Sequence, residues 1–128
     1  VPFTVRPPGD RPDYSIILYL EPLDRFNQAA IGFDMLSEAN RRTAMEAARD
    51  ARQAVLSGKV RLVQEIDPVK QPGFLLYLPL YRNAEQPGTL YGWIYSPLRA
   101  HDLFRAIFAG RDLREVIVEI YDQRIAPD

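Results

Sequence analysis

The sequence predicts an α+β fold in which a five-stranded, mostly antiparallel sheet carries flanking helices. Five short runs are apolar or alternate between apolar and polar residues, as strands do, and two longer runs have the 3.6-residue periodicity of helices. Their order, β, α, β, β, β, α, β, lacks the regular alternation of strands and helices that a parallel sheet requires. The short polar stretch 83–88 between two of the strands is typical of a hairpin loop.

Residues 1–13 are expected to form an irregular leader, because four of the eleven prolines fall within them. Residues 14–128 are then expected to form one domain, since a chain of 128 residues that is 47% hydrophobic supplies a single core. At its start, Ser15–Leu20 is short and apolar and stops ahead of Pro22, which predicts a buried strand. A helical turn over Phe26–Ala30 is possible after it.

The clearest helix is predicted for Glu38–Ala54, with Ser37 as its N-cap, because strong helix formers fill the whole stretch. Its helical phase turns Arg41 toward the sheet, among the apolar residues of the inward stripe. A salt bridge or snorkelling at the helix end would explain this placement structurally. A pocket between helix and sheet would explain it functionally, because a guanidinium binds a carboxylate through two parallel hydrogen bonds. The inward stripe consists of Ala44, Met45, Ala48, Ala51 and Val55.

Three further strands are predicted after this helix, at Val60–Glu65, Gly73–Tyr81 and Thr89–Ser96. The second of them is apolar on both faces, which favours a central position in the sheet. Pro79 is unusual there, because proline removes one donor from the ladder and marks a strand end, an edge or a bulge.

The chain is predicted to finish with a second helix, Leu98–Ala109, and a last strand, Glu115–Tyr121. Pro97 is expected to open this helix and Gly110 to end it, in keeping with the preferences of the two residue types. The last strand alternates well between polar and apolar residues.

Enzyme chemistry has little support in the sequence. The chain has no cysteine, so disulfides, thiol nucleophiles and cysteine-bound zinc are excluded. The single histidine, His101, lies in the first turn of the second helix, where a solvated side chain is the simplest explanation. Glycine-rich phosphate loops, nucleophile elbows and zinc-binding motifs are missing, and the carboxylates are scattered. We therefore expect no enzyme activity, no metal and no cofactor.

Charge and hydropathy also exclude two classes of partner. The formal net charge is −1, which gives no reason to expect nucleic acid or an anionic membrane surface as a partner. No apolar run approaches the roughly 18 residues that a membrane-spanning helix needs.

The aromatic residues Tyr91, Trp93 and Tyr95 share one face of their strand and suit either core packing or a binding cleft. Core packing accounts for most of them, so we do not expect all three to line one pocket.

A set of short motifs, spread over residues 14–121 in a fixed order, resembles the CHASE domain. The set comprises Tyr19-Leu-Glu-Pro22, Asn27, Gly32-Phe-Asp-Met35, Ser37-Glu38, Arg41-Arg42, Leu62-Val-Gln-Glu65, Gln71-Pro-Gly-Phe74, Tyr77-Leu-Pro-Leu-Tyr81, Gly92-Trp-Ile-Tyr-Ser-Pro97, Arg99 and Asp102-Leu-Phe104.

The resemblance implies an extracytoplasmic ligand sensor. CHASE domains occur in bacterial histidine kinases, diguanylate cyclases and adenylate cyclases, and in plant cytokinin receptors. The chain resembles their membrane-distal, PAS-like part, excised from a larger membrane receptor. By that resemblance it lies on the periplasmic or extracellular face of the cell membrane and is connected to it through missing flanking transmembrane helices. It binds a small molecule between helix and sheet, forms a homodimer in the full receptor, and signals to cytoplasmic kinase or cyclase domains.

The resemblance also implies a set of pocket residues, with departures from the family. Arg41 stands where cytokinin receptors carry an aspartate that accepts hydrogen bonds from the purine, and an arginine offers only donors. A cytokinin ligand is therefore not expected, and a small anionic or amphipathic ligand is. Tyr77 replaces a smaller residue, which predicts a shallower pocket, and Ala51-Arg52 replace a helix-ending pair, so the helix is expected to run further. The expected ligand-binding residues are Met35, Arg41, Met45, Val63, Leu75, Tyr77, Pro79 and Gly92.

Two other hypotheses stay open at this point. A CHASE-like domain could contact a partner protein or dimerise without a small-molecule ligand, and a small enzyme of unknown type would need a catalytic constellation. A closed pocket between the first helix and the strand Gly73–Tyr81 would favour the small-molecule sensor.

The first prediction concerns Arg41. A buried guanidinium must find an acceptor, so we expect Glu65, a main-chain carbonyl at a strand end or water to hold it when no ligand is bound. Arg41→Ala should weaken the binding of a ligand found by screening by about 1.5–3 kcal/mol, the scale of a charge-assisted hydrogen bond. Calorimetry would measure the change. An unchanged affinity, or an Arg41 side chain in bulk solvent, would make this residue a surface charge only.

Overall fold

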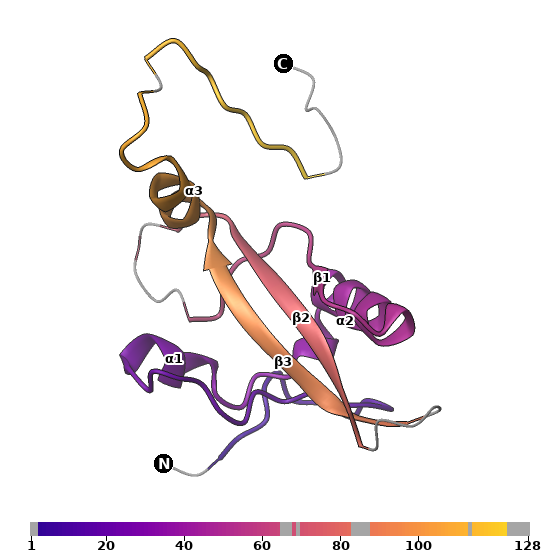
Figure 1. The fold of residues 1–128 in the computed structure, drawn as a ribbon. Coiled ribbons are helices and arrows are strands. Elements are labelled where there is room, and N and C mark those ends of the chain that lie inside the picture. The colour runs from indigo at the N-terminus through magenta and orange to yellow at the C-terminus, as the bar shows by residue number, and fades with distance from the viewer. Residues whose placement is uncertain (1–2, 65–67, 69, 83–87, 113, 123–128) are drawn as a thin grey trace.

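A three-stranded antiparallel sheet forms the centre of the protein. The computed structural model describes residues 3–64, 68, 70–82, 88–112 and 114–122. Among these residues, the sheet contains β1 (Val55–Leu56), β2 (Gly73–Arg82) and β3 (Thr89–Arg99), in the order β1-β2-β3 (Figure 1). The α+β class is confirmed, but the described residues form three strands where five were predicted. The PAS-like arrangement stays a prediction.

The hairpin of β2 and β3 is the longest paired element. Its register runs from Gly73 opposite Arg99 to Arg82 opposite Thr89, with a bulge at Leu80 and Tyr81. Both strands extend beyond their predicted ends at residues 81 and 96. The loop that the sequence predicted between them falls mostly on residues 83–87, outside the described part of the chain.

Hydrogen bonds show which edge of β2 each residue faces. The main-chain N–H and C=O of Leu75 point toward Ser57, whose hydroxyl accepts from the N–H and whose N–H donates to the C=O. Residues two apart in a strand point the same way, so the nitrogen of Pro79 also faces that side and not β3. Because β1 reaches only to Val55, opposite Tyr77, no described strand stands opposite Pro79 on that edge. A proline is therefore tolerated there without a lost ladder bond.

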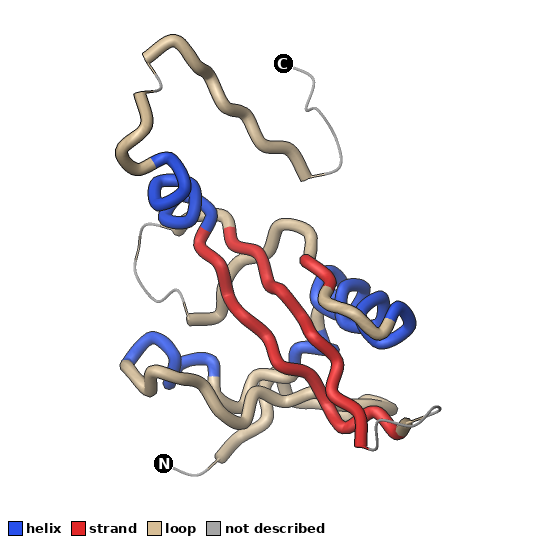
Figure 2. Tube along the Cα trace, in the orientation of Figure 1, coloured by secondary structure: helices blue, strands red, loops and turns tan. Residues whose placement is uncertain are grey.

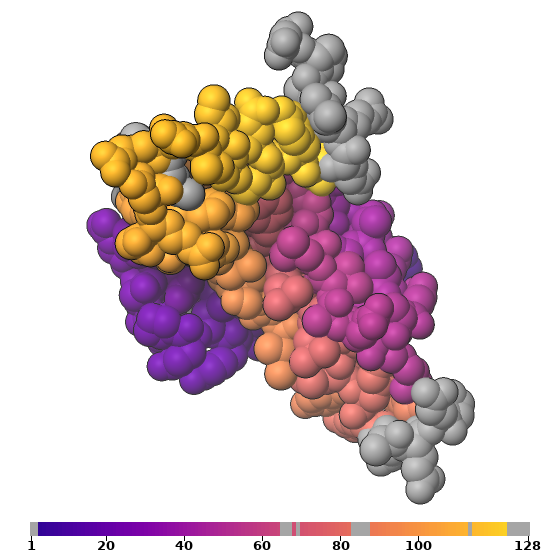
Figure 3. Space-filling view, turned by 45° about the horizontal axis from the view of Figure 1, so that its top comes forward, coloured from indigo at the N-terminus to yellow at the C-terminus, as the bar shows by residue number. Residues whose placement is uncertain are grey.

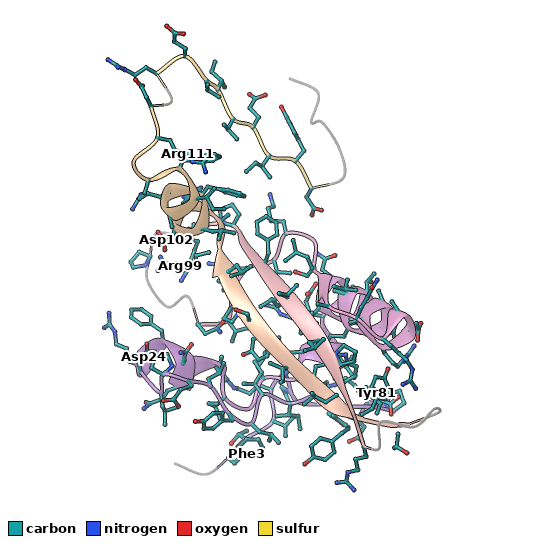
Figure 4. The ribbon with its side chains drawn as sticks, in the orientation of Figure 1. Phe3, Asp24, Tyr81, Arg99, Asp102 and Arg111 are labelled. Atoms are coloured by element: carbon teal, nitrogen blue, oxygen red, sulfur yellow. The ribbon has the colours of Figure 1, made fainter. Side chains whose placement is uncertain are left out.

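The main helix, α2 (Ala39–Ala51), lies beside β1 and β2 (Figure 1). Its N-cap is Glu38, whose carboxylate accepts from two main-chain N–H groups of the first turn, so the prediction of Ser37 as the cap was wrong. The predicted extension to residue 54 was also wrong. Arg52 adopts a left-handed conformation with φ of 54° and stops the helix, while its guanidinium lies over the ring of Tyr81. Tyr81 lies near the end of β2 that is farther from α3 (Figure 4).

Three shorter helical segments complete the described helices. α1 (Arg25–Ala30) matches the possible helical turn, and η1 (Met35–Ser37) is a single 3₁₀ turn that leads into α2. α3 (Ala100–Phe108) begins two residues later than predicted. Pro97 does not open it, because this residue still pairs with Leu75 inside β3.

Two of the predicted strands are reduced to isolated bridges. Ser15–Leu20 forms one bridge, from Ile16 to Asp34, because its other hydrogen bonds go to the irregular stretch 32–35 and not to a strand. The stretch Val60–Glu65 forms one bridge, from Val60 to Gly73, and its end lies outside the described residues. Both predictions of full strands were therefore wrong.

The last predicted strand, Glu115–Tyr121, is an extended loop in the structure (Figure 2). It leaves α3 and passes the end of the sheet near the loop after β1 (Figure 3), where the carboxylate of Asp122 accepts from the N–H of Lys59. Alternation predicts an extended conformation, but no described strand edge lies alongside this segment. Its side chains stay largely exposed, including Ile117 at 91%.

The core lies between α2 and the sheet, and the N-terminal segment closes one side of it. Met45 and Tyr77 are the largest fully buried apolar side chains, and each has 0% exposure. The remaining buried members come from the segment 17–35, from α2, from residues 60–62 after β1, and from β2. They are Ile17, Leu20, Ala30, Met35, Ala44, Ala48, Val60, Leu62 and Leu75.

A buried carboxylate, Asp34, fixes the N-terminal segment to this core. Its side chain is fully buried and accepts from Arg11 Nε at 2.7 Å and from the main-chain N–H groups of Ser15 and Leu36. The main chain of Asp34 also donates to the carbonyl of Arg6. The expected leader has no described helix or strand, yet these contacts hold it in place.

The second prediction follows from this burial. Asp34→Ala leaves the guanidinium of Arg11 and two main-chain N–H groups without their acceptor, and breaking such a buried pair costs about 3–5 kcal/mol. Urea unfolding followed by circular dichroism should show this loss. Asp50→Ala is the matched control, because Asp50 forms an exposed ion pair with Arg49 and should change stability by less than about 0.5 kcal/mol. A loss below about 1 kcal/mol for Asp34→Ala would contradict the role given to this carboxylate.

Candidate functional site

A groove of about 1320 Å³ runs along the edge of β3 that does not pair with β2. Residues 90–97 of β3 form one wall, and residues 11–21 of the N-terminal segment form the other. One side of α2 closes the groove through Arg42, Glu46 and Arg49. Figure 3 shows the N-terminal residues, in indigo and violet, beside the orange residues of β3.

The groove exists because β3 is an edge strand. Even-numbered residues of β2 face β3, since odd-numbered ones such as Leu75 face β1. In the register of the pair, the main-chain groups of Trp93 and Tyr95 then point away from β2, toward the groove. Pro97, two residues further on, has no N–H to offer on that edge.

Tyr91, Trp93 and Tyr95 all line this one groove. The expectation that they would not all share a pocket was wrong. The bulge near Tyr91 contributes, since it shifts the register at this end of the hairpin. Trp93 is held in place by a hydrogen bond of 3.1 Å from its indole nitrogen to the carbonyl of Met45.

Charged side chains of both signs surround the aromatic wall. Arg42 donates from Nε to the carbonyl of Leu36 at 2.7 Å, and its side chain is exposed at the groove. Arg49 pairs with Asp50 on the surface of the helix. The charged lining residues are Arg11, Arg42, Arg49, Asp13, Glu21 and Glu46.

Arg41 is a residue of α2, and its side chain lies on the inner side of that helix, behind the groove. Only 5% of its surface is exposed. Its guanidinium donates to the carbonyl of Arg61 at 2.7 Å and to the carboxylate of Glu38 at 3.1 Å, and it lies over the ring of Phe33. The inward orientation predicted from helical phase is thus observed, and its acceptor includes a main-chain carbonyl. Removing the guanidinium would also release these contacts, so a stability measurement must accompany any binding measurement.

The electrostatics of Glu38 reflect this arrangement. Partial burial works to raise its pKa, but hydrogen bonds from the main-chain N–H groups of Asn40 and Arg41, together with the positive charge of Arg41, outweigh burial. The net effect lowers the pKa of Glu38 below its ordinary value. The carboxylate form of Glu38 therefore caps α2 and neutralises Arg41.

Two tyrosines of the sheet meet near this guanidinium. The ring centroids of Tyr77 and Tyr95 are 6.0 Å apart, and the hydroxyl of Tyr77 contacts the sulfur of Met35 at 3.5 Å. Burial raises the pKa of both phenols, and the charge of Arg41 offsets only part of that rise. The hydroxyl of Tyr95 is buried and has no hydrogen-bond partner among the described residues.

The eight expected site residues fall into three groups. Met35 and Gly92 line the groove. Val63 is half-buried and packs against the core. The other five are buried between α2 and the sheet, where side chains fill the space: Arg41, Met45, Leu75, Tyr77 and Pro79.

The N-terminal wall of the groove was missed at the sequence level. Residues 11–21 were treated partly as a leader and partly as a buried strand, and no local pattern places them opposite β3. Tyr19, with 75% of its surface exposed, and Leu18, with 73%, belong to this wall. An apolar run whose side chains stay exposed is the feature that a structure reveals and a sequence does not.

Neither a metal centre nor a membrane span is found in the part of the chain that the structure describes. Among its residues, no three histidines or acidic side chains gather closely enough to hold a metal ion. None of its helices combines the length and the apolar character that crossing a membrane requires.

Comparison with known families assigns the chain to a class of sensor. The CHASE domain family matches residues 2–128, and the chain therefore belongs to the CHASE domain family. Members of this family are extracytoplasmic sensor modules of signalling receptors and not catalytic domains. A search of curated proteins found no match to the chain. The expected sensor class is confirmed at this level.

The third prediction concerns the cap of α2. Glu38→Gln should lower the free energy of unfolding by about 0.5–1 kcal/mol at neutral pH, the usual range for a weakened cap. The folded-state pKa of Glu38 lies below its unfolded value, so its contribution is complete above the ordinary glutamate pKa of about 4.3 and fades as the pH falls through the lower folded value. Unfolding curves of both proteins should therefore converge in acid. Glu115→Gln, at an exposed loop position, is the control that should show no such convergence.

Proposed function

We propose that this chain is the ligand-binding part of a transmembrane receptor and that a small organic molecule binds in the groove along β3. On this proposal the domain lies on the periplasmic or extracellular face of the cell membrane, between flanking transmembrane helices. Binding is signalled to a cytoplasmic kinase or cyclase domain. The groove in a chain of the CHASE domain family is the observation that carries the proposal.

The size and lining of the groove support a small-molecule ligand. Ligand sites have volumes of roughly 300–1,000 Å³, so a groove of about 1320 Å³ has room for one with some solvent left at its mouth. Rigid aromatic side chains with polar tips, such as Tyr91 and Trp93, combine apolar contact with hydrogen bonding. Both properties fit a ligand with an apolar body and a polar group.

The charges around the groove narrow the class of ligand further. The lining carries three arginines and three carboxylates, so its formal charge sums to zero, and Arg41 adds a buried positive charge behind it. Glu38 forms an ion pair with Arg41 and also caps the helix. An amphipathic molecule with a single anionic or carbonyl group is therefore the ligand class that we propose.

The predicted site residues take distinct positions in this proposal. Met35 and Gly92 would contact the ligand, while Tyr77 and Met45 would support the wall from behind. Arg41 would act through its charge, and through direct contact only if neighbouring side chains move. Three other residues would support the groove wall without contacting the ligand: Val63, Leu75 and Pro79.

A route from the groove to the rest of the receptor also follows. The N-terminal wall is fixed to the core through Asp34, which immediately precedes η1 and α2. A ligand that contacts both walls would favour the arrangement in which residues 11–21 lie close to β3. The ligand would shift the equilibrium between the two arrangements, and the size of that shift is set by the difference between its binding free energies for them.

The alternative of a protein-interaction or dimerisation module rests on a different observation. The face of the sheet turned away from α2 leaves large apolar side chains exposed, and a second copy in the full receptor would bury them. This face includes Leu56, Leu76, Leu78 and Ile94. A chain that dimerises and shows no groove ligand would support this alternative.

The fourth prediction tests the groove. The chain has one tryptophan, Trp93, so its fluorescence reports directly on this site. In a screen of small amphipathic acids and amides, at least one compound should shift this fluorescence in a saturable way and raise the melting temperature, since a ligand that binds only the folded state stabilises it.

Two variants localise the effect. A side chain added at Gly92 meets no atom within 4 Å, so Gly92→Leu should fold normally and block the groove, lowering the affinity at least tenfold. Ala47→Leu adds the same kind of group on an exposed part of α2 away from the groove and should leave the affinity unchanged. A screen without hits, or hits that bind both variants equally, would overturn the groove as the ligand site.

A further inference from the structure

The hydroxyl of Tyr95 is buried, and it has no hydrogen-bond partner within the described part of the chain. Leaving such a group unsatisfied costs about 1–3 kcal/mol, and most buried hydroxyls in proteins have a partner. A phenylalanine would fill the same space without this cost. The phenol therefore needs an explanation outside the packing of the core.

We propose that Tyr95 determines ligand specificity, and that its hydroxyl donates a hydrogen bond to an acceptor oxygen of the molecule bound in the groove. The inference rests on the proposed function and deepens it, because it requires the ligand to carry a carboxylate or a carbonyl. Part of the Tyr95 side chain lines the groove, and the residue also packs on the core, where its hydroxyl is buried. A ligand oxygen in the groove therefore reaches this hydroxyl when a neighbouring side chain moves aside.

The surroundings of the phenol favour a donor role. The charge of Arg41 lies close enough to act on both Tyr77 and Tyr95, and a positive charge there stabilises an anionic or strongly polarised acceptor. Burial raises the pKa of the Tyr95 phenol, so the hydroxyl keeps its proton at physiological pH. A protonated phenol on which a positive charge acts is suited to donate to an oxygen acceptor.

The main chain of the same residue adds to this recognition. The N–H and C=O groups of Trp93 and Tyr95 point toward the groove, where no described strand pairs with them. An acceptor oxygen can therefore meet the edge of the strand on its way to the phenol. Met35 lines the groove and contacts the neighbouring Tyr77, and its unbranched thioether can repack to admit the ligand group.

The fifth prediction uses Tyr95→Phe and two probes of equal ring size, benzoate and toluene. Titrations are followed by the NMR signal of the single indole N–H, that of Trp93. Benzoate should bind the native chain more tightly than toluene. Tyr95→Phe should weaken benzoate at least tenfold and leave toluene unchanged. Its melting temperature should equal or exceed that of the native chain, because the lost hydroxyl had no partner.

Tyr81→Phe is the matched control. Its hydroxyl lies outside the groove and donates to the carbonyl of Arg49 at 2.6 Å, so this variant should melt lower and bind benzoate as the native chain does. Equal benzoate affinity in the native chain and Tyr95→Phe, or a melting temperature of Tyr95→Phe lowered as much as that of Tyr81→Phe, would overturn the inference. If binding is blocked by Gly92→Leu but is insensitive to Tyr95→Phe, the proposed function stands and only the role of Tyr95 falls. If neither probe nor any screened acid or amide saturates the Trp93 signal, both fall.

Discussion

The arrangement of this domain depends on one buried carboxylate. Asp34 has no exposed surface, yet it accepts hydrogen bonds from Arg11, Ser15 and Leu36, which come from both sides of it in the chain. Residues 3–21 form no continuous ladder with the sheet and contribute only isolated bridges. Their position is therefore set by a few polar contacts and by the burial of Ile17 and Leu20. Since these residues form one wall of the groove, the site depends on the ion pair between Asp34, which is buried, and Arg11, which itself lines the groove.

The second constraint is the free edge of β3. Exposed strand edges invite unwanted pairing with other chains, and proteins usually cover or interrupt them. Here Pro97 removes one donor, and the N-terminal segment stands across the groove and limits access to large partners. What stays open is a narrow stretch around Trp93 and Tyr95. An edge that is shielded from other sheets but reachable by small molecules is consistent with a binding site.

The sequence predicted what is set by local periodicity and turn chemistry. α2, β2, β3 and α3 are each found within a few residues of their predicted positions, and the inward phase of Arg41 follows from helical geometry alone. The wrong predictions concern structure that depends on contacts with another part of the chain. The alternation in Glu115–Tyr121 reports an extended backbone, but pairing needs a strand edge at the right place. The cap of α2 moved from Ser37 to Glu38 because a longer carboxylate can bond two N–H groups and a guanidinium together.

The difference between local pattern and tertiary contact also explains where the candidate site lies. A pocket between helix and sheet was expected from the inward Arg41. The space itself is occupied, since Tyr77 and Met45 have no exposed surface and the guanidinium already has acceptors. The groove proposed as the ligand site lies instead along the edge of β3. Tyr95 contributes to both regions: it lines the groove, and its buried hydroxyl, on which the charge of Arg41 acts, has no hydrogen-bond partner among the described residues. A ligand with an acceptor oxygen would connect the groove to that interior charge, which neither the sequence pattern nor the core packing accomplishes alone.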